Sequence, residues 1–157
     1  VDLPLWLLGD VTEVHARTRT ALHDIEVEDT VVATLEFASG ALATLEATTA
    51  AYPGFPRRIE LSGTRGTVLL EDDRVTTVAV EPAPPEPPPA REGNQNASAS
   101  SATVADVSEH RAVLEDFLAA IEEDREPMSS GREGRRSVAV VEAIYRSARE
   151  GKPIVPA

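Results

Sequence analysis

The chain has 157 residues, of which 41% are hydrophobic, and this is enough for one domain with its own core. No run reaches the roughly 20 apolar residues that cross a bilayer and no signal peptide is recognisable, so we expect a cytoplasmic protein with no membrane contact. The net charge of −12 argues against a nucleic-acid partner, because phosphate binding needs clustered Lys and Arg. The chain contains no cysteine, which excludes disulfides and thiolate chemistry.

Residues 1–9 are apolar and predict the end of a helix, closed by Gly9 in the left-handed conformation that often follows a helix. A helix this short is not stable alone. We therefore expect an N-terminally truncated chain that starts within an element. Pro4 also fits a first helical turn, which leaves a helix start at Asp2 or Leu3 as the alternative.

Residues 11–20 alternate between polar and apolar side chains and predict a strand with one solvated face. His15 on that face could bind an anion together with Arg17 and Arg19, although a plain solvated face is the favoured interpretation. The loop that follows is rich in oxygen and nitrogen ligands, but their spacing matches no calcium-loop pattern, so we expect no metal. These loop residues are His23, Asp24, Glu26, Glu28 and Asp29.

Residues 28–71 predict antiparallel strands in series, and the rest of the chain is organised around this stretch. Its first part, residues 28–49, predicts a β-hairpin with its turn at Ser39 and Gly40. One face of its first strand is apolar, with Val31, Ala33, Leu35 and Phe37. The opposite face carries short polar side chains, which let two sheets approach closely. We predict that this face forms a homo-oligomer; it consists of Thr34, Glu36, Thr44, Glu46 and Thr48.

A turn-rich segment over residues 51–56 separates the hairpin from three further predicted strands over 58–62, 67–70 and 74–80. Tyr52 and Phe55 in this segment either pack on the sheet edge or line a ligand cleft. Gly63 and Gly66 lie between two strands with no helix after them, so they do not form a phosphate loop.

The composition changes at about residues 81–104, where a proline run precedes Gly, Asn, Ser and Ala residues. We expect a disordered Pro-rich insert, and a ligand for a proline-recognition module is the less favoured interpretation. Two amphipathic helices follow. Asp106 with Glu109 and Ser130 with Glu133 predict their capping boxes, and Gly151 predicts the end of the second helix.

The apolar stripe of the first of these helices contains Val107, Val113 or Leu114, Phe117, Leu118 and Ile121, and that of the second contains Val138, Val141, Ile144, Tyr145 and Ala148. Both stripes need an apolar surface, which the sheet supplies. The fold class expected is therefore α+β, with an open, mostly antiparallel β-sheet and helices packed on one face. The domain assigned is a single one over residues 1–157.

The sequence shows no active site of its own. No G-x-G-x-x-G follows a strand, no catalytic Ser, His and acid set is indicated, and no paired His has metal-ligand spacing. We expect no catalytic, cofactor-binding or metal-binding residue in this chain.

Six segments in order resemble the C-terminal domain of the Gfo/Idh/MocA oxidoreductases, the group of glucose-fructose oxidoreductase and inositol dehydrogenase. They are residues 1–9, 25–30, 37–41, 58–67, 116–121 and 141–148. The resemblance implies a sheet with helices on one face and an oligomer on the other. It also implies a Rossmann domain upstream that binds NAD or NADP, and a sugar, polyol or related substrate.

This chain lacks several parts of the family pattern. It lacks the Rossmann domain with its lysine and the Asp-x-x-x-His pair, whose His would fall three residues before Asp2, so we expect it to be inactive alone. Asp2 matches the acidic residue after that His, and the Tyr52 to Phe55 loop resembles a segment that flanks substrate. The alternative function is a stand-alone, non-catalytic binding or scaffold module of the same fold.

Overall fold

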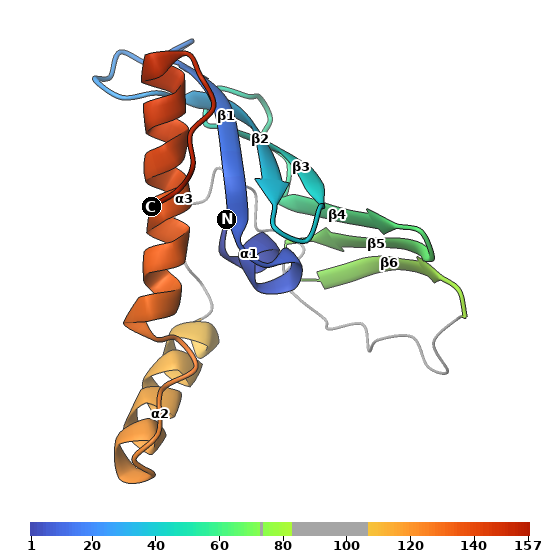
Figure 1. The fold of residues 1–157 in the computed structure, drawn as a ribbon, viewed down its shortest axis with the longest axis vertical. Coiled ribbons are helices and arrows are strands. Elements are labelled where there is room, and N and C mark those ends of the chain that lie inside the picture. The colour runs from blue at the N-terminus through green and yellow to red at the C-terminus, as the bar shows by residue number, and fades with distance from the viewer. Residues whose placement is uncertain (73, 83–106) are drawn as a thin grey trace. The chain divides into compact units, whose positions relative to one another are not determined.

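The computed structural model describes residues 1–72, 74–82 and 107–157 (Figure 1). The chain divides into two compact units, Val1–Ala51 with Asp106–Ala157 and Tyr52–Ala105, and each is described by itself. The predicted insert at 81–104 lies outside the described residues except for Glu81 and Pro82. The elements in chain order are α1 (Asp2–Leu8), β1 (Val11–Arg19), β2 (Thr30–Phe37), β3 (Leu42–Thr48), β4 (Arg58–Gly63), β5 (Gly66–Glu71), β6 (Arg74–Val80), α2 (Ser108–Glu122) and α3 (Gly131–Glu150).

The predicted α+β class with antiparallel strands is confirmed, and the strands form two three-stranded sheets, β1-β2-β3 and β4-β5-β6. The prediction had one sheet. Pro53 and Pro56 lie in the segment between β3 and β4. Proline has no amide hydrogen for a ladder, which gives a physical reason for the break. The assignment of residues 1–157 to one domain stays a prediction.

The first sheet has β2 at its centre and packs one face against α3 (Figure 1). The predicted apolar alternation of the hairpin is confirmed, since Ala33, Leu35 and Phe37 are buried. A bulge at the start of β1 allows both Val11 and Val14 to face the core. The core cluster of this unit is Leu5, Val11, Val14, Ala16, Ala33, Leu35, Phe37, Val140, Ala143, Ile144 and Ile154.

The C-terminal segment extends the sheet beyond β1. Val14 and Ile154 exchange two backbone hydrogen bonds of 2.9 Å each, so the outer edge of β1 is covered at this point. The Ile154 side chain is buried in the core. The predicted end of α3 is confirmed, because Gly151 adopts the left-handed conformation with a φ of 68°.

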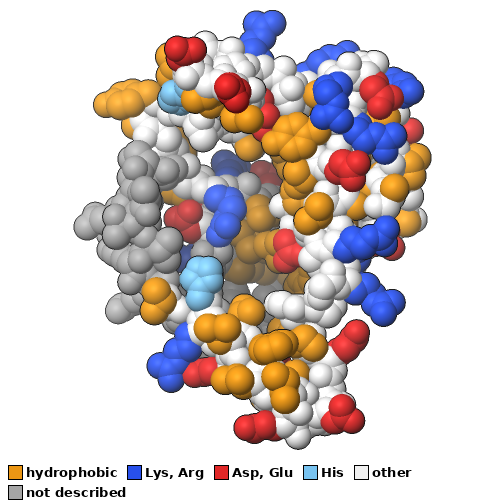
Figure 2. Space-filling view, turned by 90° about the vertical axis from the view of Figure 1, so that its left-hand side faces the viewer, with side chains coloured by type: hydrophobic (Ala, Val, Ile, Leu, Met, Phe, Trp, Pro, Cys, Tyr) orange, Lys and Arg blue, Asp and Glu red, His pale blue; other side chains and the backbone are white. Residues whose placement is uncertain are grey.

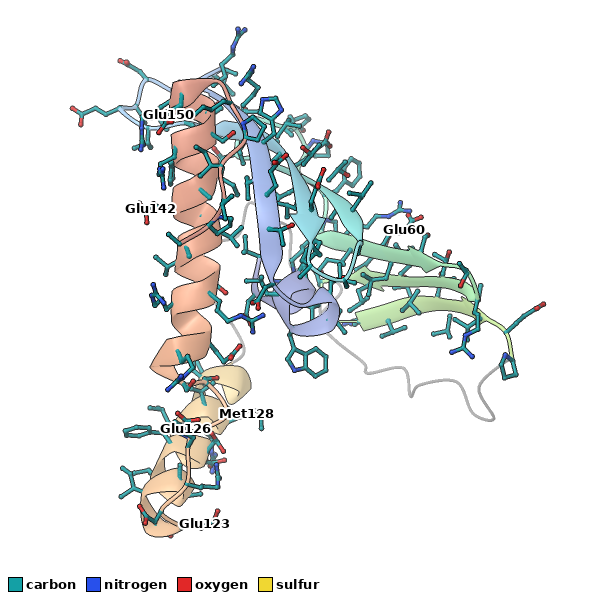
Figure 3. All side chains as sticks on the ribbon, viewed as in Figure 1. Glu60, Glu123, Glu126, Met128, Glu142 and Glu150 are labelled. Carbon is teal, nitrogen blue, oxygen red and sulfur yellow. The ribbon has the colours of Figure 1, made fainter. Side chains whose placement is uncertain are left out.

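The prediction of which side of α3 is buried is wrong. Val138 is 66% exposed, whereas Val140, Ala143, Ile144 and Ser147 are the buried residues. Only Ile144 belongs to both sets. The buried serine explains the error, because its hydroxyl is satisfied by hydrogen bonds and so a polar residue can lie on the core side. Glu142 lies on the side of α3 away from the sheet (Figure 3).

The predicted packing of α2 is also wrong. The helix begins at Ser108 with Val107 as its N-cap and no side-chain cap bond, while Asp106 lies outside the described residues. The whole predicted stripe is exposed, and Phe117 at 51% is typical of it. Figure 2 shows hydrophobic side chains gathered at the lower end of the view, where α2 lies. Among the described helices, α3 therefore makes the main contact with the first sheet, and α1 adds the buried Leu5 to the same core.

The helix ends confirm the predicted cap at Ser130 and show that the left-handed conformation predicted for Gly9 is wrong. Ser130 caps α3, since its Oγ accepts a hydrogen bond of 3.4 Å from the Glu133 amide. Gly9 follows α1 with a φ of 90° and a ψ of −157°, a glycine conformation outside the left-handed helical region expected for it. No helix in the described part of the chain is long and apolar enough to span a membrane.

The second unit is an antiparallel meander of β4, β5 and β6. Gly63 and Gly66 are paired at the turn between β4 and β5, which confirms that they connect two strands. Gly66 has a φ of 144°, and a Cβ there would collide with the carbonyl oxygen of Ala79. This close approach on β6 requires glycine.

Candidate functional site

The face of the first sheet that turns away from α3 is solvent-exposed, and we call it the open face. Its residues stand in four rows across β1, β2 and β3, because directly paired residues share a face. The rows are Glu13-Glu36-Leu42, His15-Thr34-Thr44, Arg17-Val32-Glu46 and Arg19-Thr30-Thr48. The five residues predicted for the oligomer face, Thr34, Glu36, Thr44, Glu46 and Thr48, all lie here and are exposed.

The open face is mixed in character. Two apolar side chains lie on it, Val32 at 46% and Leu42 at 77% exposure. A shallow depression across Glu13, Thr34 and Thr44 follows the first two rows. The Arg17 guanidinium donates to the carbonyl oxygen of the neighbouring Ala16 at 3.2 Å. Within the described residues, neither Arg17 nor Glu46 forms an ion pair, so both charges are available to a partner.

His15, Arg17 and Arg19 are exposed on the open face, in line with the solvated strand face that was favoured for them. Each sits opposite a different β2 residue, so they form a line along β1. The sequence-based prediction did not join them to the oligomer face, because the register between β1 and β2 depends on a long loop and on the bulge.

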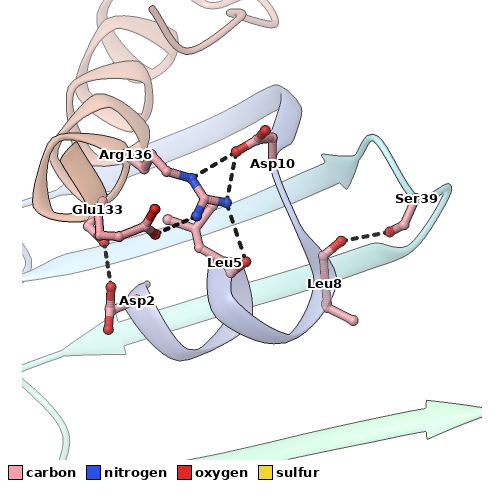
Figure 4. A network of polar contacts seen from close by, with 8 residues as sticks. Asp2, Leu5, Leu8, Asp10, Ser39, Glu133 and Arg136 are labelled. Carbon is pink, nitrogen blue, oxygen red and sulfur yellow. Dashed lines mark hydrogen bonds and ion pairs between the residues drawn. The ribbon is translucent and has the colours of Figure 1, made fainter. Parts of the chain in front are cut away.

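A second group of polar residues holds α1 against α3 (Figure 4). The Arg136 Nε donates to Asp10 Oδ1 at 2.8 Å and its Nη1 donates to Glu133 Oε2 at 2.6 Å. Its Nη2 also reaches the carbonyl oxygen of Leu5 at 3.5 Å. The hydrogen bond that Arg136 donates to Glu133, followed by the one it donates to Asp10, raises the pKa of the Arg136 guanidinium. Arg136 therefore stays charged and ties three segments together.

Asp2, predicted to flank the substrate, is part of this group. Its Oδ1 accepts a hydrogen bond of 3.0 Å from Ser137 Oγ on α3. The other end of α1 is fixed by Ser39 Oγ, which donates to the Leu8 carbonyl oxygen at 2.9 Å (Figure 4). The carboxylate of Asp2 thus has a defined orientation on the surface.

Tyr52 and Phe55 lie in the second unit and are 98% and 81% exposed. Packing of these rings on the sheet edge is therefore wrong. Asp2 belongs to the first unit, so the three predicted substrate-flanking residues are not joined in one described site. Their role in substrate binding stays a prediction.

The acidic loop between β1 and β2 is organised by Asp29, which is only 4% exposed. Its carboxylate accepts hydrogen bonds from the backbone amides of Ala21, Leu22 and His23 at 2.8, 2.8 and 3.0 Å. These bonds, with the largest effect from His23, hold the pKa of Asp29 well below its usual range. No group of three or more metal-ligating side chains forms a metal site in the described residues.

The lowered pKa of Asp29 predicts an acid-dependent stability. A carboxylate with a depressed folded pKa stabilises the fold above its unfolded pKa of about 4, and this contribution is lost as the pH falls toward the folded value. We expect the Tm of the native chain to fall below about pH 4, and Asp29→Asn to lower the Tm at pH 7 by on the order of 5 °C.

Thermal unfolding followed by circular dichroism between pH 7 and pH 2.5 measures both effects. Asp24→Asn in the same exposed loop is the matched control, because the hydrogen bonds of the described residues do not include its carboxylate. The account of Asp29 fails if the Asp29→Asn variant loses as much Tm on acidification as the native chain does.

The sequence-based prediction missed Arg136, Ser137 and Asp10 altogether. Arg136 and Asp10 are 126 residues apart in the chain, and neither belongs to a recognisable motif. The signal that was present is the apolar start of the chain, because so short a helix needs anchors elsewhere in the fold.

Residues 1–155 match the family model of the C-terminal alpha/beta domain of the GFO/IDH/MocA oxidoreductase family. D-apiose dehydrogenase from Paraburkholderia graminis is 29% identical over 162 residues, which cover 98% of this chain and 42% of that protein. Inositol 2-dehydrogenase from Rhizobium meliloti is 28% identical, over 98% of this chain and 46% of that protein.

Among solved structures, the WlbA dehydrogenase from Bordetella pertussis in complex with NADH and UDP-GlcNAcA superposes with a TM-score of 0.76 at 31% identity. The match covers 99% of this chain and 41% of that protein. The chain thus spans less than half the length of each of these relatives.

Proposed function

The chain belongs to the GFO/IDH/MocA oxidoreductase family as its C-terminal alpha/beta domain, and from this membership we propose its function. It is the substrate-binding and oligomerisation domain of an NAD(P)-dependent dehydrogenase or reductase that acts on a sugar, a polyol or a related compound. The single observation that carries this proposal is the match over residues 1–155. The sugar-related names of the relatives support the substrate class.

The dinucleotide, NAD or NADP, belongs to a Rossmann domain of the full-length protein in this proposal. The residues of this chain do not fit such a ligand: no glycine fingerprint follows a strand, and Gly63 and Gly66 form a strand connection. The catalytic residues accordingly lie outside this chain, which is inactive alone. Asp2, Tyr52 and Phe55 flank the substrate in the full-length enzyme.

The open face is the proposed site of homo-oligomerisation. It is exposed, it contains short threonine side chains at its centre, and Val32 and Leu42 give it apolar area. In a two-fold dimer whose axis runs along β2, β1 of one copy faces β3 of the other. Arg17 then lies opposite Glu46 of the other copy, because both flank Val32 in one row.

Calorimetric titration tests where the dinucleotide binds. We expect this chain to give no heat with NADH or NADPH up to millimolar concentration, and the full-length protein to bind one of them and oxidise or reduce a member of a sugar and polyol panel. Tight binding by this chain alone would contradict the proposal, as would a full-length protein that binds neither dinucleotide. A stand-alone scaffold module would bind no dinucleotide in any form.

A further inference from the structure

Polar contacts hold helix α1 along its whole length. It has seven residues, and polar contacts hold it at its first residue, its middle and its last residue. Arg136 also holds Asp10, just beyond the helix. Leu5 is the one buried side chain of α1. A short helix with this many anchors keeps its orientation and presents its remaining side chains rigidly.

The side chains that α1 presents to solvent are large and apolar. Trp6 is 76% exposed and Leu7 is 41% exposed. Trp6 is the only tryptophan of the chain. Tryptophan is, with tyrosine and arginine, enriched among the binding hot spots near the centres of protein interfaces, where its ring is desolvated. An exposed tryptophan on a helix with a fixed orientation therefore has the properties of an interface anchor.

We infer that Trp6 and Leu7 form the contact surface on which the dinucleotide-binding domain of the full-length protein docks. This inference rests on the proposed function, which supplies that domain. The relatives are more than twice as long as this chain, so a partner of sufficient size belongs to the same polypeptide. Docking in the same polypeptide needs only a small surface, because the two halves are tethered.

The observations favour a protein domain over a small molecule as the partner of Trp6 and Leu7. Ligand sites are concave, and Trp6 lines neither the depression beside α1 nor the one on the open face. The first of these is lined by Leu5, Asp10 and Arg136, on the anchored side of α1. The Arg136 contacts thus set the angle at which Trp6 meets the second domain.

Acrylamide quenching of Trp6 fluorescence tests the contact without any activity measurement. In this chain we expect quenching close to that of N-acetyltryptophanamide. In the full-length protein, with any other tryptophans changed to phenylalanine, we expect several-fold weaker quenching. Equal quenching in the two proteins would overturn the inference. Protection of Trp6 in this chain that grows with protein concentration would overturn it too, because a second copy would then be the occupant.

A variant separates docking from folding. Trp6→Ala should leave the Tm of this chain unchanged, because the ring is exposed, and should increase several-fold the rate of proteolysis between the two domains of the full-length protein. Met128→Ala is the matched control, since Met128 is 82% exposed and its side chain lies on the loop after α2 (Figure 3). Equal proteolysis of both variants would contradict the contact. If the native full-length protein does not bind NADH but its Trp6 is still protected from acrylamide, the proposed function is contradicted and the domain contact is not.

Discussion

Replacing Ser147 by alanine is expected to lower the free energy of unfolding by about 1–3 kcal/mol, a large effect for the loss of one oxygen atom. The Ser147 side chain is fully buried, and its Oγ accepts a hydrogen bond of 2.9 Å from the Ala16 amide. The same hydroxyl donates to the Lys152 carbonyl oxygen at 2.7 Å. Alanine leaves the buried Ala16 amide without this partner, and it also removes the donor to the Lys152 carbonyl oxygen in a partly buried setting.

The position of Ser147 explains why the cost is high. Its hydroxyl joins α3, β1 and the segment that carries Ile154, so one side chain connects three parts of the core. Urea unfolding followed by circular dichroism measures the change, with an unchanged m-value indicating that the unfolded state is the same. Ser137→Ala on the same helix is the matched control.

Ser137 donates its hydroxyl hydrogen to Asp2 in an exposed setting, where water can replace the lost contact. We expect Ser137→Ala to change the free energy of unfolding by less than about 0.5 kcal/mol. Equal costs for the two alanine variants would contradict the role assigned to Ser147, because the two substitutions remove the same atom from the same helix.

Strand periodicity was the most reliable guide to this fold. The alternation of Ala33, Leu35 and Phe37 predicted the buried side of β2, and it also predicted that Thr34 and Glu36 are exposed. A period of two leaves only two choices of face, and the apolar set decides between them. The same alternation could not predict the separation of six strands into two sheets, which depends on the proline-containing segment after β3.

Helix periodicity was a poorer guide, because a helix has more than two possible faces. α3 has apolar residues at Val138 and Val141 as well as at Val140 and Ile144, so hydrophobicity alone does not select the buried side. The true side contains Ser147, whose burial depends on partners in β1 and beyond the helix. Sequence patterns contain no information on such distant partners.

The residues of the candidate site also fall into a group that could be predicted from the sequence and a group that could not. The residues of the open face on β2 and β3 could be predicted, since a short hairpin turn sets their register. Their continuation onto β1 and the anchoring of α1 by Arg136 could not, because both depend on contacts between segments far apart in the chain. The family resemblance added the identity of the domain, and it did not point to the α1 contacts.

The second large effect is expected from reversing charge on the open face. In the proposed dimer, Arg17 of each copy lies opposite Glu46 of the other, so a symmetric interface contains two such pairs. Arg17→Glu places like charges opposite each other in both pairs. Like charges across an interface cost several kcal/mol, and every 1.4 kcal/mol is tenfold in affinity, so we expect a dimer weakened by about 100-fold or more.

The reciprocal substitution provides the decisive comparison. Glu46→Arg alone should weaken the dimer to a similar extent, whereas the double variant Arg17→Glu with Glu46→Arg restores the opposite charges and should recover most of the affinity. Sedimentation equilibrium of this chain at micromolar concentration measures all four proteins. A double variant as weak as the single ones would place Arg17 and Glu46 apart in the dimer, and a native chain that stays monomeric would remove the open face as the interface. Recovery in the double variant requires that the two residues meet across the two-fold axis, since they lie on outer strands on either side of β2 within one copy.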